Sequence, residues 1–112
     1  MECHSPASGL SASIAEGFLA LSGELNRSNS PELLLWLRSM PAISRLDLSE
    51  LDIDDGVAAT YAVNIVRLLR SRVPRLRIDF APQVLGHNLY RTGVLRDGGV
   101  ELRDMREDEA YG

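Results

Sequence analysis

Apolar residues alternate with small or polar ones in two short stretches near the start of the chain. Leu10–Ala15 and Phe18–Leu21 both follow this period of two, which is typical of β-strands with one buried face. Glu16 and Gly17 between them suit a tight turn. The sequence therefore predicts an opening antiparallel hairpin, preceded by a flexible tail at residues 1–8.

A different spacing, near 3.6 residues per repeat, predicts the first helix. Ser30 and Pro31 make a strong start for it, because a hydroxyl can cap the free N–H groups and proline suits the first helical position. Leu33, Leu37 and their apolar neighbours form one broad face, on which Trp36 is expected to join the core, and the helix ends before Pro41.

The clearest helical pattern of the chain runs from Val57 to Leu69. An acidic loop from Glu50 to Asp55 precedes it, and an aspartate of this loop can cap its first turn. Arg70 and Arg72 follow at the other end, where cations suit the helix dipole. We expect Leu68 to lie deep in the apolar face of this helix.

The remaining pattern predicts three more strands and one more helix. Ile43–Leu48 is a buried strand, and Leu76, Ile78 and Phe80 alternate with charged residues as one apolar strand face. A short helix begins at Pro82 and ends at Gly93, which can adopt the left-handed conformation. Val100–Leu102 is a short last strand.

This order of elements predicts an α/β fold with a mixed sheet of four to five strands, flanked by helices that form right-handed crossovers. The chain has 112 residues, which suits one domain. We place that domain at residues 9–104 and a flexible acidic tail at residues 105–112.

Charge excludes several functions. The net charge is −4, and the densest group of cations, Arg67, Arg70 and Arg72, is interpreted as a solvated helix end. A nucleic-acid-binding surface would need a larger cationic cluster. All 12 basic residues are arginines, so the chain has neither a lysine for Schiff-base chemistry nor a phosphate-loop lysine.

Cysteine content and hydropathy indicate a cytoplasmic protein. Cys3 is the single cysteine, so no internal disulfide forms, and Cys3 with His4 alone cannot complete a metal site. The sequence shows neither a signal peptide nor an apolar run of about 20 residues. We expect no cofactor and no membrane insertion.

Several polar residues are of types that can serve as catalytic or metal-binding groups. The acids from Asp47 to Asp55 could hold Mg²⁺, but a solvated acidic loop is the simpler interpretation. His87 and Tyr90 on the last helix are expected at the surface, and the early serines have no histidine–acid pair to activate them. The sequence therefore favours a protein that is not an enzyme.

Three segments, in this order and spacing, resemble the STAS domain family and its anti-sigma factor antagonists. They are FLALSGELNRSNSPELLLWL, RLDLSELDIDDGVAA and LRIDFAPQVLGHNLYRTGVL, which together span about residues 9–104. The resemblance implies a non-catalytic bacterial module that takes part in signal transduction and transcription regulation by binding another protein.

In partner-switching members of that family, a serine at the start of the central helix is phosphorylated, within Asp-Ser-Ser-Gly. Aligning on Gly56 places Asp54 and Asp55 where the family has its serines, so this loop has no hydroxyl to phosphorylate. Asp55 could imitate phosphoserine in part, since phosphoserine carries about −1.5 to −2 charges. It could equally be a plain helix cap, and the two roles can coexist.

The resemblance also implies where a partner binds: the start of the central helix and the loops beside it. The expected partner is an anti-sigma factor or related kinase-like protein. The alternative is that the chain is a small STAS subunit bracing the ATPase of a lipid-transport ABC system. Self-association as a homodimer stays open. The implied contact residues are Asn26, Arg27, Ser28, Asp52, Asp54, Asp55, Val57 and Thr60.

Overall fold

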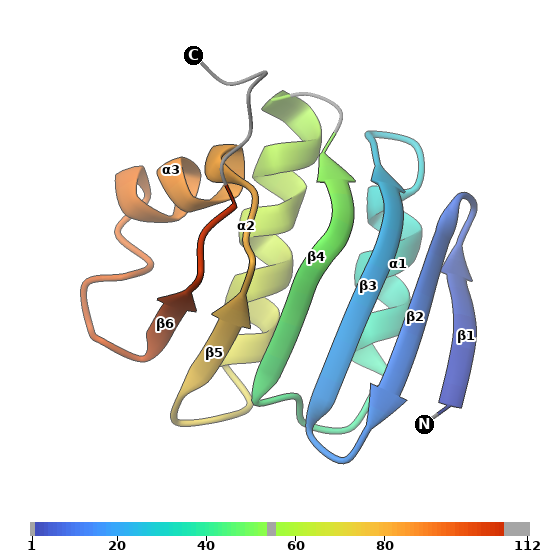
Figure 1. Ribbon diagram of the computed structural model, residues 1–112, viewed down its shortest axis with the longest axis horizontal. Helices are drawn as coiled ribbons and strands as arrows, with labels where there is room; N and C mark the ends of the chain where they lie inside the picture. Colours follow the sequence, from blue (N-terminus) through green and yellow to red (C-terminus); the bar gives the residue numbers. More distant parts are fainter. Residues whose placement is uncertain (1, 54–55, 107–112) are drawn as a thin grey trace.

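The computed structural model describes residues 2–53 and 56–106, in which six strands form one mixed sheet and three helices pack against it (Figure 1). This confirms the predicted α/β class. The elements are β1 Glu2–Ala7, β2 Leu10–Ala15, β3 Phe18–Leu25, α1 Ser30–Arg38, β4 Arg45–Ile53, α2 Gly56–Arg70, β5 Leu76–Asp79, α3 Gln83–Arg91 and β6 Val100–Arg103.

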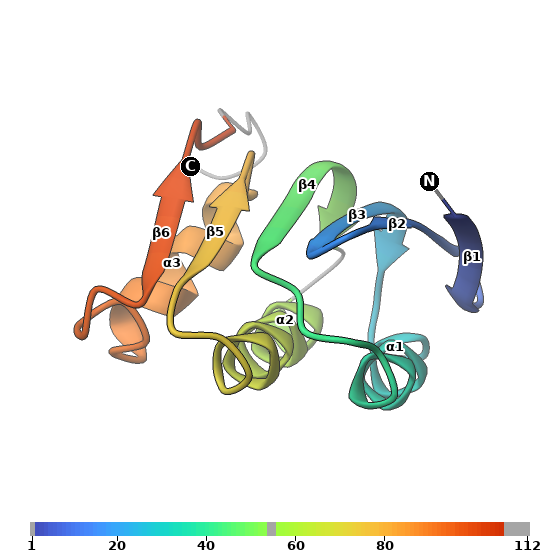
Figure 2. The same ribbon diagram turned by 90° about the horizontal axis from the view of Figure 1, so that it is seen from below.

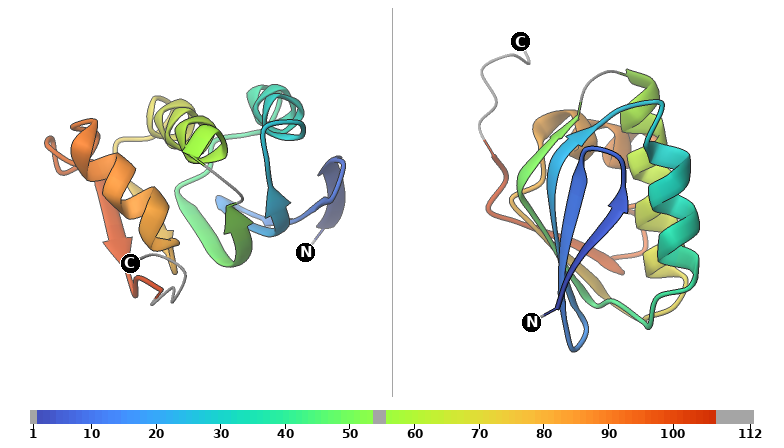
Figure 3. Two further views of the ribbon diagram at one scale, coloured as in Figure 1. Left: turned by 90° about the horizontal axis from the view of Figure 1, so that it is seen from above. Right: turned by 90° about the vertical axis from the view of Figure 1, so that its right-hand side faces the viewer.

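The strands lie side by side in chain order, from β1 at one edge to β6 at the other. The β1–β2 and β2–β3 pairs are antiparallel, and the pairs from β3 to β6 are parallel. Each parallel crossover moves the chain one strand further in the same direction. Because such crossovers keep one hand, α1, α2 and α3 all lie on the same face of the sheet (Figures 2 and 3).

The hydrophobic core lies between this face and the helices. Leu19 of β3, Leu46 of β4 and Ile78 of β5 belong to the same hydrophobic cluster as Leu37 of α1 and Leu69 of α2, and all five side chains are fully buried. Burying a leucine or isoleucine contributes roughly 1.5–3 kcal/mol. The apolar pattern of the sequence therefore maps onto one continuous core.

Residues 2–7 form the edge strand β1, whereas the sequence predicted a flexible tail at residues 1–8. The prediction of a tail was wrong because Glu2–Ala7 lacks the apolar alternation that indicates a strand. The segment is a strand because its backbone pairs with β2. Pro6 and Ala7 are buried, and proline is tolerated on an edge strand. This strand raises the sheet to six strands, instead of the four to five expected.

The turn between β1 and β2 explains a glycine in the Ser-Gly-Glu-Leu segment. A Cβ atom on Gly23 would lie 2.1 Å from the carbonyl oxygen of Gly9, and Gly23 has φ +110°. Side chains rarely adopt such a φ and could not fit at that distance. Gly23 thus lets the first turn pack directly on β3.

Several boundaries differ from the predictions: β3 continues to Leu25, beyond the predicted end at Leu21, and β4 begins at Arg45 instead of Ile43. β4 continues to Ile53, so Glu50 and Asp52 belong to a strand that the sequence ended at Leu48 in favour of an acidic loop. Pairing with β3 keeps this acidic segment extended, because Gly23 lies opposite Leu51 and Leu25 opposite Ile53. Ser30 is the first residue of α1, not its cap.

The phase of α2 also differs from the prediction by one residue. Leu69 is fully buried, whereas Leu68 is only partly buried against the edge of the core. Leu69 continues the inward row that includes Ala62 and Val66, at the spacings of three and four residues that share a helix face. Trp36 is likewise only partly buried.

Candidate functional site

Parallel pairing of β3 with β4 brings two predicted partner-binding segments to one edge of the sheet. Glu24 lies opposite Asp52, and Leu25 opposite Ile53. The last residues of β3 and β4 therefore lie side by side at the carboxyl-terminal ends of the parallel strands, which we call the carboxyl edge of the sheet (Figure 1). The predicted switch residues Asp54 and Asp55 lie outside the described residues.

Asn26 builds the loop that follows β3, although the sequence placed it in the binding surface. Its side-chain oxygen accepts hydrogen bonds from the backbone N–H groups of Ser28 and Asn29, both at 2.9 Å. Its carbonyl oxygen accepts the hydroxyl of Ser30 at 2.5 Å. This half-buried asparagine is held by the turn, while Arg27 and Ser28 are exposed on it.

Asn29, which the sequence analysis passed over, ties the same loop to the first hairpin. Its side-chain nitrogen donates to the carbonyl oxygens of Ser8 and Glu24, both at 2.8 Å, and the residue is buried. A buried amide needs such partners, since an unpaired polar group costs about 1–3 kcal/mol. The run of turn-forming residues was the only sequence signal for this role.

The start of α2 presents an apolar side chain to solvent. α2 begins at Gly56, and Val57 in its first turn is 44% exposed. Thr60 is also exposed, but its hydroxyl donates to the carbonyl oxygen of Gly56 at 3.0 Å. Val57 and Thr60 thus lie at the predicted surface, with the threonine hydroxyl committed to its own helix.

Arg106 joins the end of the chain to the end of β4. Its guanidinium donates to the carbonyl oxygens of Leu48, at 3.0 Å, and of Leu51, and lies 3.3 Å from the carboxylate of Asp52. Its backbone N–H donates to the carbonyl oxygen of Ala81 at 3.1 Å. The sequence assigned this residue to a flexible tail at 105–112. The structure instead places it across the carboxyl edge, while residues 107–112 lie outside the described part.

Phe80 is the second exposed apolar residue at this edge. The sequence predicted it on the buried face of a strand, but β5 ends at Asp79, and Phe80 has φ +58° and is 41% exposed. Its N–H donates to the carbonyl oxygen of Arg103 at 2.9 Å, which holds the bend. A bulky residue with positive φ is uncommon, and such local strain is found preferentially at functional sites.

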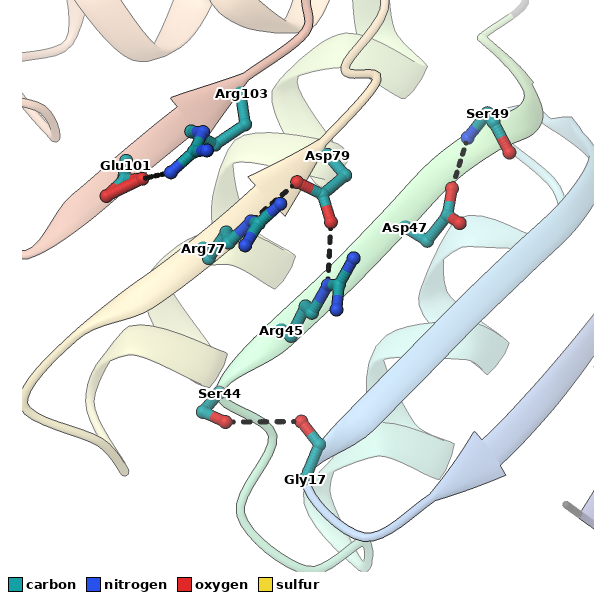
Figure 4. Close-up of polar contacts among 9 residues, drawn as sticks. All are labelled: Gly17, Ser44, Arg45, Asp47, Ser49, Arg77, Asp79, Glu101 and Arg103. Carbon is teal, nitrogen blue, oxygen red and sulfur yellow. Dashed lines mark hydrogen bonds and ion pairs between the residues drawn. The ribbon is translucent and has the colours of Figure 1, made fainter.

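The open face of the sheet carries a cross-strand ionic ladder (Figure 4). The buried carboxylate of Asp79 accepts hydrogen bonds from Arg45 and Arg77, each at 2.7 Å. Burial acts to raise the pKa of Asp79, but the two arginines outweigh it and hold the pKa below its ordinary value. Asp79 therefore stays ionised and occupied by its partners, as suits a structural ion pair.

Arg45 also extends over an aromatic ring on the same face. Its guanidinium carbon lies 5.4 Å from the centre of the Phe18 ring, within the range of a cation–π contact. On β6, Arg103 pairs with Glu101 at 2.8 Å. The contacts of Arg45 join β3, β4 and β5 on this face, whereas the Arg103–Glu101 pair lies within β6.

The other candidate residues do not assemble into a reactive centre in the part of the chain that the structure describes. His4 lies 3.2 Å from the carboxylate of Glu2 and packs against Trp36, with ring centres 5.8 Å apart. The sulfur of Cys3 lies 3.8 Å from the hydroxyl of Ser13. Residues 2–53 and 56–106 contain no group of three or more side chains arranged to hold a metal ion.

Comparison with known proteins adds no relative, because no protein-family model matches the chain and no curated protein matches its sequence. Within the described residues, none of the helices combines the length and apolar character needed to cross a membrane.

Proposed function

We propose that this chain is a non-catalytic protein-binding module of the STAS type, similar to an anti-sigma factor antagonist, and that it binds its partner at the carboxyl edge of the sheet. The observation that carries the proposal is the side-by-side position of the carboxyl-terminal ends of β3 and β4. It gathers Arg27, Ser28, Asp52 and Val57, which are dispersed in the sequence, on one exposed edge.

Exposed apolar side chains at this edge support the proposal. Val57 lies in the first turn of α2, and Phe80 follows β5, the strand next to β4. Arg106 contacts Asp52 on one side and the backbone of Ala81 on the other, so the same surface is continuous between the two strands. Aromatic anchors surrounded by polar residues are typical of the energetic centre of protein interfaces.

The charge of this edge predicts the chemistry of the partner. Glu24, Asp52, Asp54 and Asp55 are close in sequence or register, so the surface favours arginine or lysine on the partner. Neither Asp54 nor Asp55 offers a hydroxyl, and the proposal therefore includes a switch loop that is not phosphorylated. A cap at α2 and partial imitation of phosphoserine by Asp55 are both compatible with it.

Charge reversal tests the surface. Asp55→Arg is expected to leave the fold intact. It should lower the affinity for the natural partner at least tenfold, which corresponds to about 1.4 kcal/mol of binding free energy. Glu16→Arg is the matched control, since Glu16 is exposed in the β2–β3 turn at the opposite edge. Partners are captured from lysate with the unchanged protein, and the affinity of the strongest is measured for each variant.

Equal affinity of Asp55→Arg and the unchanged protein would place the interface elsewhere. Loss of binding in Glu16→Arg alone would place the interface at the amino edge, which is formed by the amino-terminal ends of the parallel strands. Asp55→Ser should weaken binding less, and incubation with a cognate kinase and ATP shows whether it restores phosphorylation. Stoichiometric phosphate on Thr60 of the unchanged protein would refute the silent switch. The identity of the captured partner also distinguishes the two proposed partner classes, an anti-sigma factor and a transporter ATPase.

A further inference from the structure

A shallow hollow of about 360 Å³ lies at the other end of the molecule, between the end of α2 and the segment that joins α3 to β6. Figure 2 looks onto this amino edge of the sheet. The hollow is rich in arginine: its lining includes Arg67, Arg70 and Arg96, with Ser71, Thr92 and Asp97. The sequence analysis interpreted Arg67 and Arg70 as a solvated helix end.

Arg70 is held rigidly before any ligand arrives. One terminal nitrogen donates to the carbonyl oxygen of Val73 at 2.8 Å, and the other lies 3.3 Å from the carboxylate of Asp97. Its Nε is buried, has no hydrogen-bond partner among the described residues and packs on the backbone of Gly99, where a Cβ atom would lie 2.0 Å away. A guanidinium fixed in this way loses little freedom when it binds an anion.

The positive charge of the hollow is not balanced by its one acid. Asp97 already accepts the N–H of Gly99 at 2.8 Å and the guanidinium of Arg70. Arg67 and Arg96 form no ion pair with any residue in the described ranges 2–53 and 56–106. The guanidinium groups of Arg67 and Arg96 therefore line the same hollow as the guanidinium of Arg70, which is held by its hydrogen bonds.

The hydroxyl groups of the lining are used by the helices. Ser71 donates to the carbonyl oxygen of Leu68 at 2.6 Å, and Thr92 donates to that of Asn88 at 2.7 Å. Helix C-termini carry partial negative charge, which these hydroxyls and the arginines offset. The donors left for a ligand are those of the arginines, and they match an oxyanion with two charges.

We infer that this hollow binds the dianionic phosphate group of a phosphomonoester, held by Arg67 and Arg96 over the pinned Arg70. Guanidinium groups recognise phosphate oxygens in pairs and at fixed angles. The phosphate can come from a small soluble molecule or from a lipid headgroup. The inference is independent of the proposed protein-binding surface, which lies at the opposite edge of the sheet.

The test titrates the full chain with inorganic phosphate at constant ionic strength and follows backbone amide signals by NMR. A second arm measures sedimentation with vesicles containing phosphatidic acid, a lipid phosphomonoester. We expect saturable shifts at residues 67–71 and 92–97, binding to vesicles, or both. Arg67→Ala with Arg96→Ala should weaken the binding about tenfold or more, since two charge-assisted contacts are lost. Arg38→Ala with Arg75→Ala removes the same charge from exposed positions outside the hollow and should change little.

Saturable binding to phosphate alone assigns a soluble ligand, and binding to vesicles alone assigns the lipid. Shifts that rise without saturation and no vesicle binding would overturn the inference. An equal loss in the two double variants would also overturn it, because net charge would then explain the effect. Gly99→Ala, which displaces Arg70, should reduce phosphate binding even though it removes no charge.

Discussion

Leu68 and Leu69 are adjacent in α2 but differ in burial, and the difference has a measurable consequence. Leu69 is fully buried in the core, and Leu68 lies at its margin. Removing a buried side chain costs the lost transfer energy plus the energy of the cavity that remains, whereas a marginal site can relax.

We expect Leu69→Ala to lower the free energy of unfolding by about 2–5 kcal/mol. Leu68→Ala is the matched control and should cost less than half as much. Urea denaturation followed by circular dichroism measures both. A larger loss for Leu68→Ala would mean that the phase of α2 is the one predicted from the sequence.

Asp79 gives a prediction about pH. Because its pKa is lowered in the folded state, the stability it contributes is fully present above the pKa of the unfolded carboxyl, about 4. That stability is lost as the pH falls through the lower, folded value. We expect Asp79→Asn to cost about 1–3 kcal/mol at neutral pH, since Arg45 and Arg77 then lose their charged acceptor.

The cost should shrink as the pH falls from about 4, the pKa of the unfolded carboxyl, through the lower pKa of Asp79 in the folded protein, where the unchanged protein loses the same charge. Denaturant melts at several pH values provide the measurement, with Asp104→Asn as the control, because Asp104 is an exposed carboxylate after β6. A cost that is constant with pH would show that the ionic ladder does not stabilise the sheet.

At the scale of elements, β1 forms one lateral edge of the sheet. It covers the edge of β2, which would otherwise expose unpaired backbone groups. Asn29 reaches the carbonyl oxygen of Ser8, so β1 and its turn also brace the loop between β3 and α1. A polar segment can hold this position because backbone hydrogen bonds, not apolar side chains, bring it there.

A pair of substitutions in β1 distinguishes a strand from a loose tail. Ala7 is buried and Ser5 is exposed on the same strand. Ala7→Asp should destabilise the protein by at least about 1 kcal/mol, since it buries a charge, and Ser5→Asp should be nearly neutral. Thermal unfolding compares the two; no effect of either would indicate that residues 2–7 do not pack.

At the scale of the whole molecule, charges of opposite sign gather at opposite edges of the sheet. The parallel strands point the same way, and α1 and α2 return to the amino edge, whereas α3 runs across the strands (Figure 1). Most arginines lie toward the amino edge, where Glu16 and Asp97 also lie, and several acids lie at the carboxyl edge, where Arg106 pairs with Asp52. These arginines are Arg38, Arg45, Arg67, Arg70, Arg72, Arg75, Arg77 and Arg96, and these acids include Glu24, Glu32, Glu50, Asp52 and Asp104.

This separation predicts salt-dependent binding at the carboxyl edge, which rests on the proposed function. Charge complementarity acts mainly on the association rate and is screened over about 8–10 Å at physiological salt. The association rate of the captured partner should fall several-fold as salt rises, and Glu24→Gln should reduce that dependence. Stopped-flow mixing measures it, and Glu16→Gln at the opposite edge should change little.

The local pattern of the sequence determined the class of the fold and most of its elements. Both strands of the opening hairpin, the long helix α2, the short helix before Gly93 and the last strand follow from apolar spacing and turn residues. They could be predicted because each depends on residues that are near one another in the chain.

Only the tertiary structure decided the features that depend on distant partners. β1 is a strand because β2 offers it an edge, and Phe80 leaves its strand because Arg103 binds its backbone. Arg106 reaches β4, and Arg70 meets Asp97, across intervals that no local pattern spans. Hydrogen bonds and ion pairs between remote residues need geometry that apolar periodicity does not encode, so the surfaces proposed here became visible only in the folded chain.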